Sequence, residues 1–111
     1  MIPKPQKHKS RRKKAVEIPP IVKKIVAERD KGICIFCGQA GLPEAHYIRR
    51  SHGGLGIEQN IVTLCRICHR NYDSPSNKEL SEMIGRSIEN HLKSHYPNWN
   101  KEDLIYRKEN I

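Results

Sequence analysis

The sequence predicts a small α+β domain in which two short strands and a helix are held together by a metal ion. Two Cys-x-x-Cys pairs carry this prediction, Cys34 with Cys37 and Cys65 with Cys68. The chain has 111 residues, of which 36% are hydrophobic and 5% aromatic, so its core is small. Small cores usually need disulfides or a metal for stability. Between the two pairs, two apolar segments flank a glycine-containing loop, as in a β-hairpin.

The cysteine spacing favours structural zinc over two disulfides. Each pair forms a short knuckle that directs two sulfurs toward one ion, and four thiolates complete a tetrahedral site. The chain shows no signal peptide, which argues for a reducing compartment. It also lacks an apolar run of membrane-spanning length. We therefore expect a soluble, cytoplasmic protein with no membrane partner.

Positive charge is concentrated at the N-terminus. The net charge is +9, and residues 1–14 carry seven Lys or Arg and no acidic residue. The remainder of the chain has 14 basic and 12 acidic residues. Such a tail adds salt-sensitive affinity for phosphate groups. A leader that only improves solubility is the alternative interpretation.

Residues 1–18 are rich in Pro, Lys and Arg, and we expect a basic disordered tail there. Pro19 and Pro20 then begin a helix that ends near Gly32. An apolar stripe along this helix predicts packing against the zinc unit, and it consists of Ile21, Val22, Ile25 and Val26. This helix and the zinc-containing segment form the expected domain, residues 19–75.

The segment between the knuckles predicts a hairpin. Residues 44–50 are expected to form the first strand and residues 61–64 the second, antiparallel to it. Gly53 and Gly54 mark the intervening loop. The second knuckle is expected to continue into a helix that ends near Tyr72.

Residues 76–111 are expected to form a C-terminal helical extension. Ser76 and Glu79 have the spacing of a capping box, and the helix should end before Pro97. Asn100 is expected to cap a last short turn. The predicted buried stripe of the long helix is Leu80, Met83, Ile84, Ile88 and Leu92. On the same helix, His91 and His95 are interpreted as a surface pair.

Three polar residues inside the cysteine frame fit the hydrolysis of phosphodiester bonds. That reaction needs an activated water, neutralised phosphate charge and a stabilised leaving oxygen. His46 lies on the first strand and suits a general base, because the ordinary pKa of histidine is near neutral. Asn60 can hold the loop through backbone hydrogen bonds. His69, on the following helix, can hold a divalent ion.

These residues resemble the HNH endonucleases. The resemblance rests on His46, Asn60 and His69 within the double Cys-x-x-Cys frame, on Gly53-Gly54 and on the stretch NIVTLCRICH. It covers roughly residues 33–73. It implies a ββα-metal fold, DNA cleavage, His46 as general base, Asn60 as the loop-fixing residue and His69 as a metal ligand. It also implies a bacterial or phage source, with phage or mobile-element proteins as further partners.

The sequence departs from the family where a metal ligand is expected. The residue before the base is usually Asp or His, but here it is Ala45. Glu44 is expected on the opposite strand face from Ala45 and is therefore predicted to fit poorly. Asp73 lies four residues after His69, on the same helix face, and is the favoured second ligand. The catalytic ion can be magnesium, manganese, nickel or zinc.

Four arginines flank the expected site and are candidates for contacts with the DNA backbone. They are Arg49, Arg50, Arg66 and Arg70. The sequence thus predicts a metal-dependent DNA endonuclease. Two alternatives remain open at this point: a non-catalytic zinc module that binds nucleic acid, and a zinc finger that binds protein.

Overall fold

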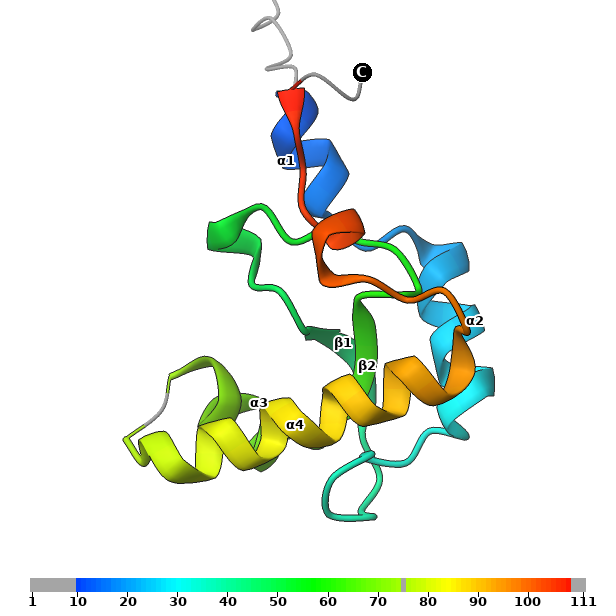
Figure 1. Cartoon of the computed structure of the whole chain (residues 1–111). Helices are drawn as coiled ribbons and strands as arrows, with labels where there is room; N and C mark the ends of the chain where they lie inside the picture. The colour runs from blue at the N-terminus through cyan, green and yellow to red at the C-terminus, as the bar shows by residue number, and fades with distance from the viewer. Residues whose placement is uncertain (1–9, 75, 109–111) are drawn as a thin grey trace, which may run out of the picture.

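Two antiparallel strands form the centre of the fold (Figure 1), in a computed structural model that describes residues 10–74 and 76–108. Strand β1 (Leu42–His46) pairs with β2 (Ile61–Leu64), and all four β2 residues are buried. The α+β class with a two-stranded sheet is confirmed. Strand β1 begins earlier than predicted and ends at His46. Beyond this point, the Ile48 N–H bonds to the side chain of Asn60 in place of a strand partner.

Two helices flank the hairpin. Helix α2 (Pro20–Asp30) begins at the predicted proline and contacts both strands. It ends where Lys31 adopts a left-handed conformation, with Gly32 next. Helix α3 (Arg66–Asp73) follows the second cysteine knuckle directly. Both helices agree with the sequence prediction to within about two residues at each end, which is the usual uncertainty of helix boundaries.

Helix α4 (Lys78–His95) crosses the sheet (Figure 1) and closes the core. Its buried Ile84, Ile88 and Leu92 pack with Val62 and Leu64 of β2. Its N-cap is Asn77, which accepts a hydrogen bond from the Leu80 N–H at 3.1 Å, so the predicted cap at Ser76 is one residue off. Met83 is 50% exposed, and its predicted place in the core is wrong. Neither α4 nor any other described helix is long and apolar enough to cross a bilayer.

The two ends of the described chain lie together beside the loop between the strands (Figure 1). The sequence predicted a disordered tail over residues 1–18, but part of this segment forms helix α1 (Arg11–Val16). Residues 1–9 lie outside the described part. Two short 3-10 helices follow, η1 (Arg50–His52) in the loop and η2 (Lys101–Leu104) near the C-terminus. The Leu55 N–H donates to the Leu104 carbonyl at 2.8 Å, which anchors the C-terminal segment on the loop.

Candidate active site and zinc-binding cluster

The four cysteines converge at one end of the hairpin. Their sulfurs all lie within 4.8 Å of one another, and the sulfurs of Cys37 and Cys65 are 3.5 Å apart. Within the pairs, the Cys37 N–H points at the sulfur of Cys34, and the Cys68 N–H points at that of Cys65, at 3.5 and 3.4 Å. These contacts hold each knuckle in shape. The cluster has the ligand number and type of a structural zinc site.

The chemistry of the four thiols also fits a cation. Burial opposes ionisation of Cys34, but backbone N–H groups around its sulfur outweigh burial and lower its pKa to about 7. Burial and the neighbouring thiols raise the pKa of Cys68. Four thiolates therefore cannot coexist here without a compensating positive charge. A divalent ion supplies that charge in place of the protons, so these residues can hold zinc.

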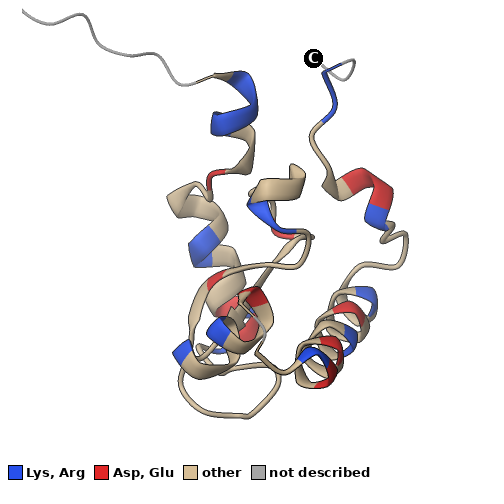
Figure 2. Cartoon of the chain, turned by 90° about the vertical axis from the view of Figure 1, so that its left-hand side faces the viewer, with Lys and Arg blue, Asp and Glu red and all other residues tan. Residues whose placement is uncertain are grey.

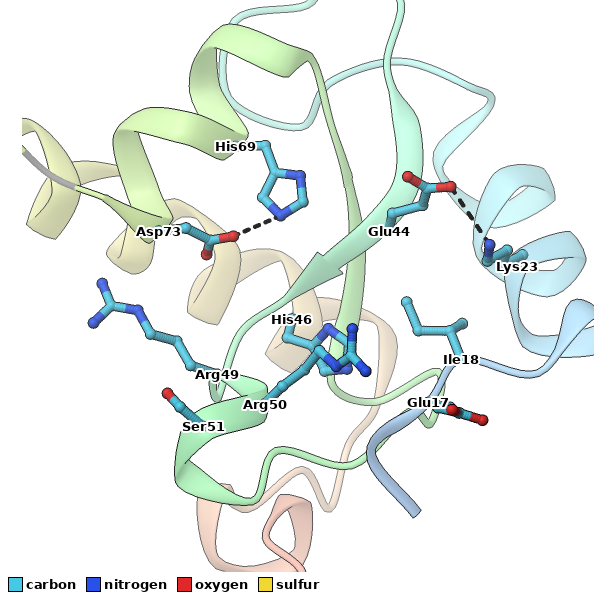
Figure 3. Close-up of a pocket in the computed structure, with 10 residues that line it drawn as sticks. All are labelled: Glu17, Ile18, Lys23, Glu44, His46, Arg49, Arg50, Ser51, His69 and Asp73. Carbon is cyan, nitrogen blue, oxygen red and sulfur yellow. Dashed lines mark hydrogen bonds and ion pairs between the residues drawn. The ribbon is translucent and has the colours of Figure 1, made fainter. Parts of the chain in front are cut away.

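A second cluster lines an open pocket of about 760 Å³ between β1, α3 and the start of α2 (Figure 3). The pocket brings the predicted His46, His69 and Asp73 together. Arg49 and Arg50 enter from the loop, and charged residues thus dominate the wall. The remaining lining residues are Glu17, Ile18, Lys23, Glu44 and Ser51.

His46 is held by a backbone carbonyl. Its side chain is 7% exposed, and Nε2 lies 2.8 Å from the carbonyl oxygen of Val16. Since a carbonyl only accepts, the Nε2 atom must carry the proton, and Nδ1 is the acceptor of the neutral ring. Burial lowers the pKa of His46, although the Val16 carbonyl opposes this effect. The ring is therefore neutral at physiological pH.

His69 and Asp73 face each other across one turn of α3 (Figure 3). The Nε2 atom of His69 lies 2.8 Å from an oxygen of Asp73. This contact raises the pKa of His69, against the effect of burial. Within residues 10–74 and 76–108, no third His, Cys, Asp or Glu ligand atom lies within 4.8 Å of both. Two protein ligands plus water and phosphate oxygens suit ions such as Mg²⁺, which bind through few protein groups.

Asn60 connects the two ends of the loop. It is fully buried, and its Oδ1 accepts the Ile48 N–H at 2.8 Å. Its Nδ2 donates to the carbonyls of Ile48 and Leu55, at 3.2 and 2.8 Å. These three bonds fix the backbone just beyond His46, as expected of an asparagine at this position.

One family model matches the part of the chain that carries this geometry. The model of the family described as HNH endonuclease matches residues 34–74. This segment contains the four cysteines, the hairpin and the three polar residues of the site. Residues 34–74 are thus similar to an HNH endonuclease domain. The match covers well under half of the chain, so helices α1, α2 and α4 lie outside the matched segment.

The chain is also similar to a characterised bacterial protein. It is 37% identical over 76 residues to the type IV methyl-directed restriction enzyme EcoKMcrA of Escherichia coli (strain K12). The aligned part is 59% of this chain and 27% of that enzyme. The chain thus spans about a quarter of the relative that it matches.

Within residues 34–74, the position of residue 45 explains why it cannot serve as a metal ligand. Ala45 is fully buried in the core with Val62 and Leu64, so it faces away from the pocket. Glu44 and His46 share the other strand face, and both line the pocket (Figure 3). The predicted position of Glu44 on the face opposite Ala45 is therefore confirmed, and its poor fit as a metal ligand stays a prediction. Lys23 holds its carboxylate at 3.4 Å.

The four predicted arginines occupy different environments. Arg50 is exposed at the pocket, whereas Arg49 donates to the Tyr72 carbonyl at 2.8 Å and braces the loop against α3. Arg66 and Arg70 are exposed on α3 but do not line the pocket. Figure 2 shows a further concentration of basic residues on α1. Two charged pocket residues, Lys23 and Glu17, were not predicted from the sequence as members of the site.

A buried ion-pair network lies outside the HNH pocket. The Asp30 carboxylate is fully buried and accepts hydrogen bonds from Arg29, from the Thr63 N–H and from His91. The distance from Asp30 to His91 is 2.6 Å. His91 thus has a buried acidic partner, so its interpretation as one member of a surface pair with His95 is wrong. This network joins α2, β2 and α4.

Proposed function

We propose that this chain is a metal-dependent endonuclease that hydrolyses phosphodiester bonds in DNA, with His46 as the general base. One observation carries the proposal. A neutral, carbonyl-held histidine and a His-Asp pair of metal-ligand type line the same pocket. The match of residues 34–74 to the HNH endonuclease family supports it.

His46 is suited to removing a proton from water. Because Val16 accepts the Nε2 proton, the lone pair on Nδ1 is available to a water molecule at the scissile phosphate. The lowered pKa of His46 keeps this atom unprotonated in neutral solution. As the water oxygen bonds to phosphorus, its proton passes to Nδ1 of the ring, and the bond from phosphorus to the leaving oxygen breaks.

His69 and Asp73 are the groups that would hold the catalytic ion. They come from adjacent turns of one rigid helix and present an imidazole nitrogen and a carboxylate oxygen side by side. A divalent ion bound there supplies positive charge for the phosphate and the departing oxygen. Glu44 adds negative charge to the same pocket and stabilises a cation at longer range.

DNA is the substrate that the surrounding charge favours. Arg50 is exposed at the pocket, Lys23 lines it, and α1 carries four consecutive basic residues from Arg11 to Lys14. Guanidinium and ammonium groups neutralise phosphates without reading base sequence. The relative in Escherichia coli is named as a methyl-directed restriction enzyme. Methylated DNA is therefore a second substrate to compare with unmethylated DNA.

The direct test is nicking of supercoiled plasmid by the zinc-loaded protein in the presence of Mg²⁺, Mn²⁺, Ni²⁺ or Zn²⁺. Plasmids prepared from methylating and non-methylating hosts are compared. We expect cleavage by the native chain and a loss of about 100-fold or more in His46→Ala, as for removal of a general base. His52→Ala is the matched control, because His52 is exposed and does not line the pocket.

Two outcomes would reject the proposal. Equal cleavage by the native chain and His46→Ala would show that His46 is not the base. Salt-dependent DNA binding with no cleavage in any metal would favour a non-catalytic binding module. The absence of a ligand at position 45 gives that alternative little support, because Ala45 faces the core.

A further inference from the structure

The segment from Ser10 to Ile18 forms part of the wall of the pocket, outside the matched family segment. It contains α1 and the chain that leads into α2. Two hydrogen bonds hold it against the loop between the strands, and one of its side chains is buried. The Gly56 N–H donates to the Ala15 carbonyl at 2.9 Å, and Arg12 donates to the Ser51 carbonyl at 3.1 Å. The side chain of Val16 is 6% exposed.

The same segment supplies the hydrogen-bond partner of the proposed base. The Val16 carbonyl lies 2.8 Å from Nε2 of His46, and the two residues are 30 positions apart in the sequence. A neutral imidazole has one protonated nitrogen, and a hydrogen-bond acceptor on one nitrogen selects which one it is. Without this carbonyl, the His46 ring could carry its proton on either nitrogen.

We propose that the Ser10–Ile18 segment is a positioning element, whose Val16 carbonyl fixes His46 with the proton on Nε2 and the acceptor on Nδ1. This inference rests on the proposed function, because it concerns the orientation of the proposed base. It assigns a structural role to part of a basic tail. The segment carries both phosphate-binding charge and the atom that orients the ring.

Gly56 shows how closely the segment is fitted to the loop. A Cβ atom at position 56 would lie 1.8 Å from the Glu17 carbonyl oxygen and 2.5 Å from the carbonyl carbon. Both are backbone atoms, so they cannot move aside alone. Gly56 is not among the glycines with positive φ, so alanine fits its backbone conformation. Gly56→Ala should therefore force the loop and the segment around Val16 apart.

The first measurement reads the state of the His46 ring directly. Long-range proton–nitrogen NMR of the full-length, zinc-loaded chain at about pH 8 distinguishes the two neutral forms of each histidine. We expect His46 in the native chain to be the Nε2-protonated form. In Gly56→Ala, we expect a mixture of the two forms. Retention of zinc and of the native circular dichroism spectrum shows that the variant is folded.

A second variant weakens the acceptor without adding a side-chain atom. Replacing the peptide bond between Val16 and Glu17 by an ester, through an α-hydroxy acid at position 17, makes the Val16 carbonyl a weaker acceptor. We expect the His46 ring to shift toward the mixed population in this protein also. In both variants, kcat should fall at least ~10-fold while KM changes less than about 2-fold, because ground-state DNA binding is retained.

Lys13→Ala is the matched control. It removes positive charge from the same segment, and the contacts of Arg12, Ala15 and Val16 do not involve the exposed Lys13 side chain. We expect weaker DNA binding with an unchanged Nε2-protonated ring. A native ring state in the folded ester variant would overturn the inference. If the native chain cleaves no DNA, the NMR result still tests the positioning role, so the two proposals fail separately.

Discussion

His69 and Asp73 lie 2.8 Å apart across one turn of α3, in the same pocket as His46 (Figure 3). The contact raises the pKa of His69, so a proton would compete with a metal ion for the same nitrogen. Metal affinity at this pair should therefore increase as the pH rises and His69 loses its proton. Helix α3 carries both residues and so fixes the imidazole and the carboxylate side by side.

Asp73→Asn should weaken binding of Mn²⁺ by about 10- to 100-fold, because the substitution removes a carboxylate that binds the ion or orients its ligand. It should also lower the pKa of His69, since Asp73 is the main group that raises it. Calorimetric titration of zinc-loaded protein with Mn²⁺ measures the affinity. Glu79→Gln, on the exposed surface of α4, is the control for loss of one negative charge. Equal affinity in both variants would remove Asp73 from the site.

Removal of zinc should unfold the HNH domain and not merely inactivate it. Cys34 and Cys68 belong to the same core cluster as Ile84 and Ile88 of α4, so loss of the ion also disturbs the packing of that helix. We expect a strong chelator to abolish the cooperative thermal transition and re-added zinc to restore it. Circular dichroism with metal analysis tests this. A chelated protein that keeps its native melting temperature would show that the cysteines do not hold a structural ion.

Asn60→Ala should destabilise the fold by about 2–3 kcal/mol, because it leaves the buried Ile48 N–H without its acceptor and removes two further bonds. Denaturant unfolding monitored by fluorescence of the single Trp99 measures the loss. Asn98→Ala is the control, since Asn98 is exposed. Equal stability of the two variants would mean that the loop does not depend on Asn60.

The sequence predicted those elements whose signals are local. The prolines before α2, the cysteine spacing and the apolar stripe of α4 each determine structure within a few residues. Alternation along β1 also placed Glu44 correctly on the face opposite Ala45. The sequence did not show that this is the pocket face, because only the packing of β1 against the core decides which face is buried.

The contacts of Val16 with His46 and of Asp30 with His91 could not be predicted from the sequence. Val16 contacts His46 through its backbone carbonyl, and every residue type has one, so no side chain marks the site. Asp30 and His91 are 61 positions apart and meet only because α4 crosses over the sheet beside α2. Such contacts depend on tertiary packing, which helical and strand periodicity does not specify.

Asp30 gives the fold a specific dependence on pH. Its carboxylate is buried, which disfavours the charge, but hydrogen bonds from His91, Arg29 and Thr63 outweigh burial. They hold the pKa of Asp30 far below its ordinary value. A carboxyl group with a depressed folded-state pKa stabilises the protein above its unfolded pKa of about 4. That stabilisation is lost as the pH falls below this value toward the folded-state pKa.

Asp30→Asn should therefore cost about 3–5 kcal/mol at neutral pH, because Arg29 loses the partner of its buried charge. The variant should also lose part of the decline in stability that the native protein shows in acid. Denaturant unfolding at a series of pH values from neutral to about 3 measures both effects. Glu102→Gln changes the same charge at an exposed position and should leave the curve unchanged. Parallel curves for the native protein and Asp30→Asn, offset by a constant amount, would show that Asp30 is not the group responsible.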